Sequence, residues 1–330
     1  MPDTDVLVVS THSTAGWQAA VRELVAAFER AGASVALAAP EEVARVRTFM
    51  LTDFVEARAA RRAAREALVE HSPRMIVYCS MTAALLWPRP GAIWLDSIAA
   101  ENRPGRHGVW QRIVERRRLK QAPLVLAMSA QSVDLLDGRV RNVSVVPTPV
   151  ERSGEPAPER DIDALTYASG DPKKRRLELV LESWETARRP GERLVVAGIE
   201  DLDTPAGVEL AGKLTPQAYR ALLRRTRVFV VAPRREDYGI APLEALADGC
   251  LLVSTPASGP YPALELGRML DPRLISEQLG RALRVALDDP LPDYARRATP
   301  LLEPFSRSAV DRTISREVLP RLGSTTHRRP

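Results

Sequence analysis

The stretch Val228–Gly259, VFVVAPRREDYGIAPLEALADGCLLVSTPASG, decides the fold of this chain. It begins with a short apolar run that ends at Pro233, continues as a charged loop, and turns helical after Gly239. A second apolar run, Leu251–Ser254, follows the helix. Two buried strands joined by a helix predict a parallel β-α-β unit, with the charged loop at the carboxyl end of the first strand.

Two glutamates flank the start of the predicted helix. Glu236 lies in the loop and Glu244 lies about one turn inside the helix, with seven residues between them. The first N–H groups of a helix lack intrahelical acceptors and its dipole favours an anion, while Gly239 permits close approach of a ligand. We therefore predict an anion site here, in which Glu244 accepts hydrogen bonds from a ribose diol. The alternative is a plain loop charge followed by a solvated helix face.

The alternation of short apolar runs and helical stretches extends through the whole chain of 330 residues. This pattern predicts an α/β fold with two Rossmann-like, doubly wound parallel sheets that face a central cleft. The predicted parts are a first domain over residues 1–150, a proline-rich linker over 151–163, a second domain over 164–305, a helix over 306–322 that packs back toward the first domain, and a frayed tail over 323–330. Within the second domain we predict single helices over Lys173–Ala187 and Pro272–Leu287.

Composition excludes several classes of protein. Hydrophobic residues are 45% and charged residues 27%, the balance of a globular chain. The first residues lack a positive segment ahead of an apolar one, no apolar run is long enough to cross a membrane, and two cysteines cannot staple a secreted scaffold. We therefore expect a cytoplasmic protein. The net charge is +5, but aromatic residues are only 5%, too sparse for a stacking platform, so we expect no nucleic-acid partner.

A second basic motif, GDPKKRR over 170–176, follows a predicted strand. It holds two of the chain's four lysines, Lys173 and Lys174, beside Arg175, although the chain otherwise strongly prefers arginine. A compact ammonium group suits phosphate oxygens, and cations crowded at a helix start are tolerable when an anion lies among them. The motif predicts a phosphate site, and the alternative is a solvated basic turn.

Residues 233–253 resemble the Glu-x7-Glu signature of the retaining nucleotide-sugar glycosyltransferases with the GT-B fold, the family numbered four, also known as glycosyl transferases group 1. The family pattern is Pro-Ser-x-x-Glu-Gly-Phe-Gly-Leu, three residues, Glu-Ala, then Ala-x-Gly-x-Pro-Val-Val. The resemblance implies that Glu236 lies near the donor sugar, that Glu244 binds the nucleotide ribose, and that Tyr238, Gly239 and Ile240 line the donor site. Asp237, Arg234 and the pair Cys250-Leu251 depart from the pattern and leave the donor's identity open.

The basic motif resembles the family's diphosphate-binding stretch. The alignment sets Arg175 at the family lysine and Arg176 at its glycine, and it leaves open which of Lys173, Lys174 and Arg175 touches phosphate. The turn Gly212-Lys213-Leu214 resembles the turn under the nucleotide base, which implies donor contacts for Gly212 and Leu214. Gly16 is what remains of the family's glycine-rich loop after the first strand, whose amides approach the donor diphosphate or the acceptor. The resemblance implies a donor contact for Gly16, and a plain strand–helix turn is the alternative.

Three further residues of the first domain are candidates for the acceptor side. His12 is either an acceptor-side base or a structural loop histidine. Asp96, at the end of a predicted strand, either points into the cleft or caps the strand, and Asn102 can bond acceptor hydroxyl groups.

Two stripes of cations follow helical spacing, at Arg58, Arg61, Arg62 and Arg65, and at Arg112, Arg116 and Lys120. They are either solvated helix faces or a peripheral contact with an anionic membrane.

Together these features predict a retaining glycosyltransferase of cell-envelope or glycan biosynthesis. Its co-substrate would be a nucleotide-diphosphate sugar, and its acceptor a glycan, a lipid or a small molecule. The cleft segments hold no Asp-x-Asp motif, so we expect metal-independent transfer without a cofactor, with Glu236, Lys173, Lys174 and Arg175 as the catalytic groups. The alternatives are an epimerase-like enzyme of the same fold and a non-catalytic nucleotide-sugar-binding protein.

Overall fold

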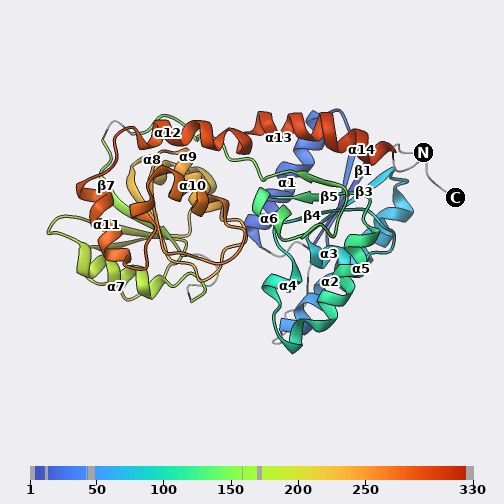
Figure 1. Ribbon diagram of the computed structural model, residues 1–330, viewed down its shortest axis with the longest axis horizontal. Coiled ribbons are helices and arrows are strands. Elements are labelled where there is room, and N and C mark those ends of the chain that lie inside the picture. Colours follow the sequence, from blue (N-terminus) through green and yellow to red (C-terminus); the bar gives the residue numbers. More distant parts are fainter. Residues whose placement is uncertain are drawn as a thin grey trace. The chain divides into compact units, whose positions relative to one another are not determined.

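The structure is a computed structural model that describes residues 4–11, 14–41, 43, 49–157, 159–168 and 173–324 (Figure 1). The chain divides into two compact units. The first is Met1–Pro149 together with Phe305–Pro330, and the second is Val150–Pro304. Each unit has its own parallel sheet, so each is described by itself.

The first unit is built on a six-stranded parallel sheet with the strand order β2-β1-β3-β4-β5-β6. Its strands are β1 (Val6–Ser10), β2 (Val35–Ala38), β3 (Met75–Cys79), β4 (Ala92–Leu95), β5 (Val125–Ala127) and β6 (Val143–Val145). The central strands are continuous apolar runs because helices bury both faces of the sheet.

The helices of the first unit lie between these strands and at the end of the chain. They are α1 (Ala15–Arg30), α2 (Phe49–Glu70), α3 (Met81–Leu85), α4 (Ala99–Asn102), η1 (Arg106–Gly108), α5 (Val109–Gln121), α6 (Ala130–Asp134), η3 (Glu303–Phe305), which spans the unit boundary, α13 (Arg307–Thr313), the π-helical turn η4 (Ile314–Val318) and α14 (Leu319–Ser324).

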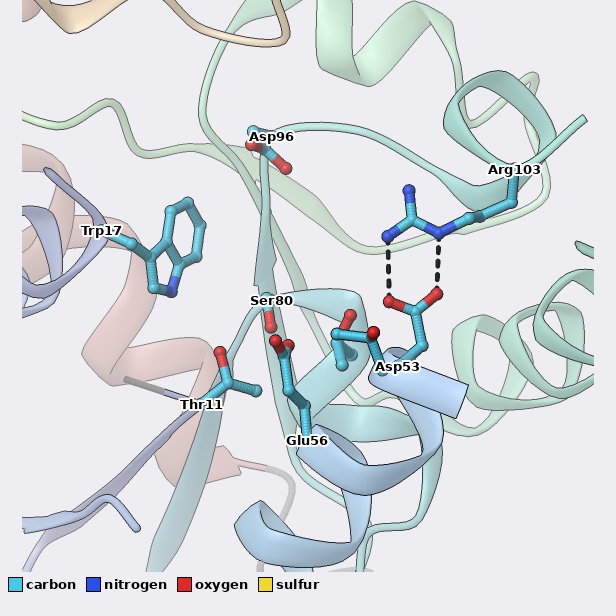
Figure 2. A pocket seen from close by; sticks show the side chains of 9 residues that line it. Thr11, Trp17, Asp53, Glu56, Ser80, Asp96 and Arg103 are labelled. Atoms are coloured by element: carbon cyan, nitrogen blue, oxygen red, sulfur yellow. Dashed lines mark hydrogen bonds and ion pairs between the residues drawn. The ribbon is translucent and has the colours of Figure 1, made fainter. Parts of the chain in front are cut away.

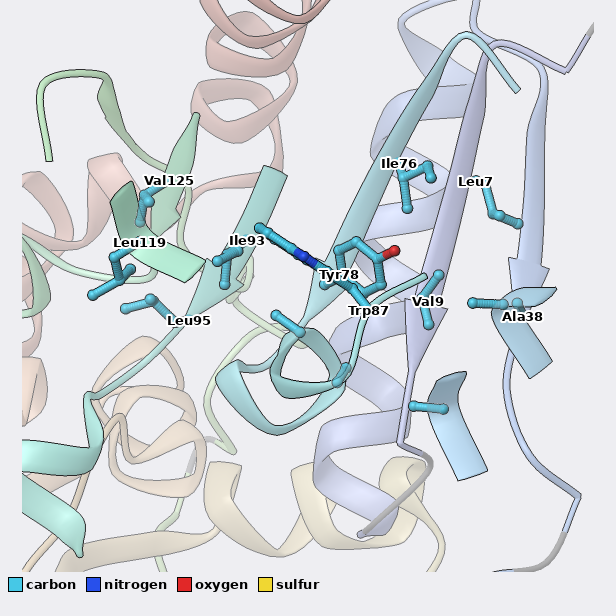
Figure 3. Close-up of a cluster of buried hydrophobic side chains, with 14 of the residues drawn as sticks. Leu7, Val9, Ala38, Ile76, Tyr78, Trp87, Ile93, Leu95, Leu119 and Val125 are labelled. Atoms are coloured by element: carbon cyan, nitrogen blue, oxygen red, sulfur yellow. The ribbon is translucent and has the colours of Figure 1, made fainter. Parts of the chain in front are cut away.

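One face of this sheet carries the main apolar core. Figure 3 shows Leu7, Tyr78, Ile93 and Leu119 among its side chains, which come from strands and from the helices α2, α3 and α5. Small residues of α2, such as Ala60, allow this arginine-rich helix to lie close to the sheet.

The opposite face is covered by α1. Trp94 alternates with Ile93 along β4 and its ring lies 5.3 Å from that of Trp17 on α1. Helix α13 packs on α1, where Arg30 and Asp311 form a two-bond ion pair with N···O distances of 2.7 and 2.8 Å. The last helical residues of the chain therefore complete the first unit.

The second unit has a five-stranded parallel sheet with the order β11-β10-β7-β8-β9. Its strands are β7 (Ile162–Tyr167), β8 (Leu194–Ala197), β9 (Val208–Gly212), β10 (Thr226–Val231) and β11 (Leu251–Ser254). Its helices are α7 (Leu177–Ala187), α8 (Pro216–Arg224), α9 (Ile240–Ala247), α10 (Pro262–Leu270), η2 (Pro272–Leu274), α11 (Leu279–Asp288) and α12 (Tyr294–Leu302). In this unit α7 packs on α11, and α9 packs on α12.

Two helix predictions in this unit are wrong at their starts. The helix predicted over Pro272–Leu287 is interrupted, because Ile275 bridges to Ser254 and Ser276 donates to the Ser254 carbonyl at 3.0 Å. The helix predicted over Lys173–Ala187 begins at Leu177, so the basic residues form the turn that precedes it.

Candidate functional site

The candidate donor site starts at the carboxyl ends of β7 and β10, which are neighbours in the sheet. The basic turn follows β7 and the charged loop follows β10, so both leave the sheet at the same edge. There Nη1 of Arg175 lies 3.3 Å from Oε2 of Glu236. The Arg175 guanidinium carbon also lies 5.9 Å from the centre of the Tyr167 ring. The structure thus joins the two motifs that carry the phosphate and donor-sugar predictions.

The loop that carries Glu236 is held on a second loop of the same unit. The Glu236 N–H donates to the Ser258 carbonyl at 3.0 Å. Gly239 has φ of +79°, and a Cβ there would lie 2.6 Å from a ring carbon of Tyr261. A Cβ at Gly259 would collide with the Glu236 carbonyl oxygen. These glycines let the backbone pack closely enough to fix Glu236 at the start of α9.

Glu244 lies one turn inside α9 and is bound to an arginine of α8. Nη1 of Arg220 is 3.3 Å from Oε1 of Glu244, and Nε of Arg220 is 2.7 Å from Oδ2 of Asp248. Asp248 has no exposed side-chain surface, and it also accepts the N–H and the hydroxyl of Ser153 at 2.8 and 2.9 Å. Within the described residues Oε2 of Glu244 accepts no hydrogen bond. Arg220 therefore fixes one carboxyl oxygen of Glu244 and leaves the other for a ligand.

Burial dominates the electrostatics around Glu244. It raises the pKa of the Glu244 carboxyl, and Arg220 opposes that rise. The nearby Tyr219 is buried, its pKa is also raised by burial, and its hydroxyl has no hydrogen-bond partner among the described residues. The ring of Tyr219 lies 5.1 Å from that of Tyr167. Tyr167 ends β7 and Tyr219 lies on α8, so the aromatic pair joins the carboxyl edge of the sheet to the helix that carries Arg220.

The remaining donor-side predictions, apart from Gly16 in the first unit, lie in the same unit. Tyr238 is buried, and Ile240 is the first residue of α9. Gly212 ends β9 with φ of +66°, and half-buried Leu214 lies in the short turn before α8. Lys173 and Lys174 are exposed in the basic turn. Arg176 has φ of +52°, the left-handed region that favours glycine, which fits the alignment of this residue with the family glycine.

The acceptor-side predictions of the first unit separate from one another. His12 lies outside the described residues. Gly16, the donor-side prediction in this unit, is exposed in the first turn of α1. Asp96 lines a cavity of about 300 Å³ at the carboxyl edge of the sheet (Figure 2). Asn102 does not line that cavity; it borders a smaller one of about 40 Å³.

Several residues of these sites were not found from the sequence. Arg220, which holds Glu244, belongs to no motif. Glu56 and Trp17 line the same cavity as Asp96. The sequence signal for Glu56 is a carboxylate in the first turns of an otherwise arginine-rich helix. The arginines of that helix predict only a basic stripe, so Glu56 is not singled out.

The two arginine stripes are not uniformly solvated. Arg61 donates to the Leu86 carbonyl at 3.3 Å, and Arg112 donates to the Gly105 carbonyl at 2.9 Å. The exposed members are Arg58, Arg62, Arg65, Arg116 and Lys120. In the described part of the chain, no helix has both the length and the apolar character needed to cross a bilayer.

Solved structures place the fold in one class. Sucrose-phosphate synthase from Thermosynechococcus elongatus is 15% identical, with a TM-score of 0.73 over 98% of this chain and 100% of that chain. Trehalose 6-phosphate synthase from Burkholderia multivorans is 11% identical, with a TM-score of 0.66 over 98% and 99%. WaaG, a glycosyltransferase involved in lipopolysaccharide biosynthesis, is 13% identical, with a TM-score of 0.63 over 97% and 98%. The chain has the GT-B fold of these glycosyltransferases.

The second unit also matches a family of known sequences. Residues 148–299 match the family model described as Glycosyl transferases group 1. A search of the curated proteins found no match. The match assigns a glycosyl transferases group 1 domain to the second unit, and the likeness of the whole chain to the solved glycosyltransferases is one of fold.

Proposed function

We propose that the chain is a retaining glycosyltransferase that moves a sugar from a nucleotide-diphosphate donor to an acceptor hydroxyl group. The observation that carries this proposal is the contact between the basic turn and the Glu-x7-Glu loop, made by Arg175 and Glu236 at 3.3 Å. It sets positive charge for a diphosphate beside a carboxylate suited to the sugar, at the carboxyl edge of a parallel sheet.

The groups around the leaving diphosphate have the largest role in the proposed reaction, because they must stabilise its growing negative charge. The bond from the anomeric carbon to the β-phosphate oxygen breaks, a bond to the acceptor oxygen forms, and the hydroxyl proton is released. Negative charge grows on the β-phosphate as the sugar leaves. Lys173, Lys174 and Arg175, with the first-turn N–H groups of Ile240 and Ala241, supply preorganised positive charge for it.

The nucleotide half of the donor would be held by Glu244. One of its oxygens is fixed by Arg220, and the other can accept a hydrogen bond from a ribose hydroxyl. We expect Glu244→Ala to weaken nucleoside-diphosphate binding by about 1.5–3 kcal/mol, the value of a hydrogen bond to a charged group. Calorimetry with the folded variant measures this. Glu185→Ala, an exposed carboxylate on α7, is the control, and equal affinities for both variants would disprove the assignment.

Transfer is expected to be independent of metal ions, because the basic turn can neutralise the diphosphate by itself. Activity should survive dialysis against EDTA within about twofold, since a metal that carried the phosphate charge would be worth several kcal/mol. The measurement is product formation before and after treatment. Loss of activity that Mg²⁺ or Mn²⁺ restores would contradict this expectation.

The whole proposal is tested by a donor screen. UDP-, GDP-, ADP- and TDP-sugars are compared by thermal shift, since a specific ligand raises the apparent stability of the folded state. Nuclear magnetic resonance of the product then shows whether the anomeric configuration of the donor is kept. A donor that binds without release of nucleotide in any acceptor mixture would identify a non-catalytic binding protein instead.

Peripheral contact with an anionic membrane is part of the proposal. Exposed cations of α2 and α5 support it, together with Ile113, a side chain that is 62% exposed between Arg112 and Arg116. Vesicles containing phosphatidylglycerol should sediment the protein at low salt, and the binding should weaken at high salt. Equal sedimentation with purely zwitterionic vesicles would count against an electrostatic contact.

A further inference from the structure

The cavity that Asp96 lines in the first unit is surrounded by polar side chains that belong to no sequence motif. Thr11, Ser80 and Asp96 follow the adjacent strands β1, β3 and β4, so all three lie at the carboxyl edge of the sheet. Glu56 reaches the same space from α2, and Trp17 reaches it from α1. Figure 2 shows the Glu56 carboxyl pointing into the space between Trp17 on one side and the ion pair of Asp53 with Arg103 on the other. The volume of about 300 Å³ fits a ligand of monosaccharide size.

The described lining of this cavity carries a net negative charge. Its lining includes three carboxylates, Asp53, Glu56 and Asp96, and one cation among the described residues, Arg103. That cation is engaged by Asp53 in a bidentate pair, with Nε and Nη2 at 2.7 and 2.9 Å from the two carboxyl oxygens. Asp53 also accepts from the Gln111 side chain at 3.2 Å. Arg103 therefore already forms an ion pair with the buried carboxylate of Asp53, and it would bind an incoming anion only weakly.

The surroundings of Glu56 also disfavour a bound anion. Burial raises the pKa of its carboxyl, and the negative charge of Asp53 raises it further, while Arg103 acts in the opposite direction. The cavity thus disfavours additional negative charge. A phosphate group carries about 1.5–2 negative charges at neutral pH and would meet repulsion and desolvation here, because the one cation of the described lining, Arg103, is already paired with Asp53.

The same lining suits hydroxyl groups. Carboxylates are strong acceptors for O–H donors, and the hydroxyls of Thr11, Thr52, Ser80 and Thr82 can both donate and accept. The half-buried indole of Trp17, supported by Trp94 behind it, offers a flat apolar surface to the C–H face of a sugar ring.

We infer that this cavity binds the acceptor of the transfer reaction and selects a hydroxyl-rich acceptor that carries no phosphate or carboxylate group. Glu56 and Asp96 bind the acceptor hydroxyls in this arrangement. The inference rests on the proposed function, because it takes the bound molecule to be the acceptor. The names of the sucrose-phosphate and trehalose 6-phosphate synthases, which are similar in fold, denote phosphorylated products. The acceptor inferred for this chain carries no phosphate and differs from those products in this respect.

The first experiment compares matched acceptor pairs. The full chain, with the donor identified by the thermal-shift screen, is given glucose, mannose or fructose, or the 6-phosphate of each, alongside neutral disaccharides and polyols. Release of nucleoside diphosphate is measured. The best uncharged acceptor should exceed its phosphorylated partner at least about tenfold in kcat/KM, since one unfavourable charged contact is worth that much. A phosphorylated sugar that is used equally well or better overturns the inference, and so does a panel in which no uncharged compound stimulates release.

The second experiment changes the cavity. Glu56→Gln should raise the KM for the best acceptor about tenfold, while the Kd for the donor stays unchanged. Glu70→Gln, an exposed carboxylate on the same helix, is the matched control and should change neither value. Thermal unfolding of both variants shows whether they are folded. An unchanged acceptor KM in folded Glu56→Gln overturns the role of this cavity.

A direct binding measurement separates failure of this inference from failure of the proposed function. Saturation-transfer nuclear magnetic resonance with glucose and with glucose 6-phosphate tests the cavity without any donor. Tighter binding of the phosphate, lost in Glu56→Gln, overturns the inference even if donor turnover is normal. Preferential binding of glucose that depends on Glu56, in a protein that binds none of the nucleotide sugars, supports the cavity's selectivity while the donor proposal fails.

Discussion

Replacing Asp248 with alanine is expected to lower the free energy of unfolding of the second unit by about 3–5 kcal/mol, the cost of removing one partner of a buried ion pair. Asp248 is fully buried and accepts three hydrogen bonds, two from Ser153 and one from Nε of Arg220. Its loss leaves Arg220, whose side chain is 14% exposed, with Glu244 and the Glu151 carbonyl as its remaining partners among the described residues. Urea unfolding followed by a probe in each unit measures the change.

The control for Asp248→Ala is Glu155→Ala. Glu155 also forms an ion pair, with Arg152 at 3.1 Å, but its side chain is 88% exposed. An exposed pair of this kind contributes at most about 1 kcal/mol. If the two variants lose similar stability, the network around Asp248 is not the support of Glu244 that its geometry indicates. A loss confined to the second unit is also expected, because all of these contacts lie within it.

Local patterns in the sequence were enough to predict the strands and the helix that carries Glu244. The predicted run Leu251–Ser254 is a strand with those bounds, and Glu244 lies one turn inside a helix that starts at Ile240. Both results depend on apolar periodicity and on glycine near the helix start, which are properties of short segments. The GT-B fold was predicted from the resemblance of the same segment to its family, and the structural comparisons confirm it.

Contacts between distant segments were not predictable in this way. Arg220 and Glu244 belong to different helices, and Asp53 and Arg103 are 50 residues apart. The predicted helix over Pro272–Leu287 failed because the Ser276 N–H bonds to the carbonyl of Ser254 at the end of a strand, a tertiary contact that overrides local propensity. A single sequence shows which residue types are present, but the partner of each charge depends on the topology.

Removing the guanidinium of Arg175 should give the largest kinetic effect, because Arg175 touches both halves of the proposed donor site. We expect Arg175→Ala to lower kcat by about 100–1000-fold, the cost of losing one preorganised group that stabilises developing charge. Arg175→Lys keeps the charge but loses the planar fork, and it should recover only part of the rate. Lys173→Ala and Lys174→Ala are measured beside it, since the sequence leaves open which cation contacts the phosphates. Steady-state donor kinetics with folded variants give these values.

Arg176→Gly is the matched control for Arg175→Ala. It removes the adjacent positive charge while suiting the left-handed backbone at that position, so it should leave kcat within about threefold of the starting value. If all the cation variants, Arg175→Ala included, match Arg176→Gly in turnover and in donor saturation, the phosphate site lies elsewhere and the placing of the donor fails with it.

The ion pair with Glu236 complicates the interpretation of Arg175→Ala, and a double-mutant cycle resolves it. If Arg175 only positions Glu236, then adding Arg175→Ala to Glu236→Gln should cost nothing further. If Arg175 also contacts the diphosphate, the double variant should lose at least another tenfold in kcat, since one charge-assisted contact is worth about 1.5–3 kcal/mol. The second result is expected, because Arg175 belongs to the basic turn that the proposal assigns to the diphosphate and also lies 3.3 Å from Glu236. A cycle in which the two variants show complete redundancy would restrict Arg175 to a positioning role and leave the lysines to hold the donor.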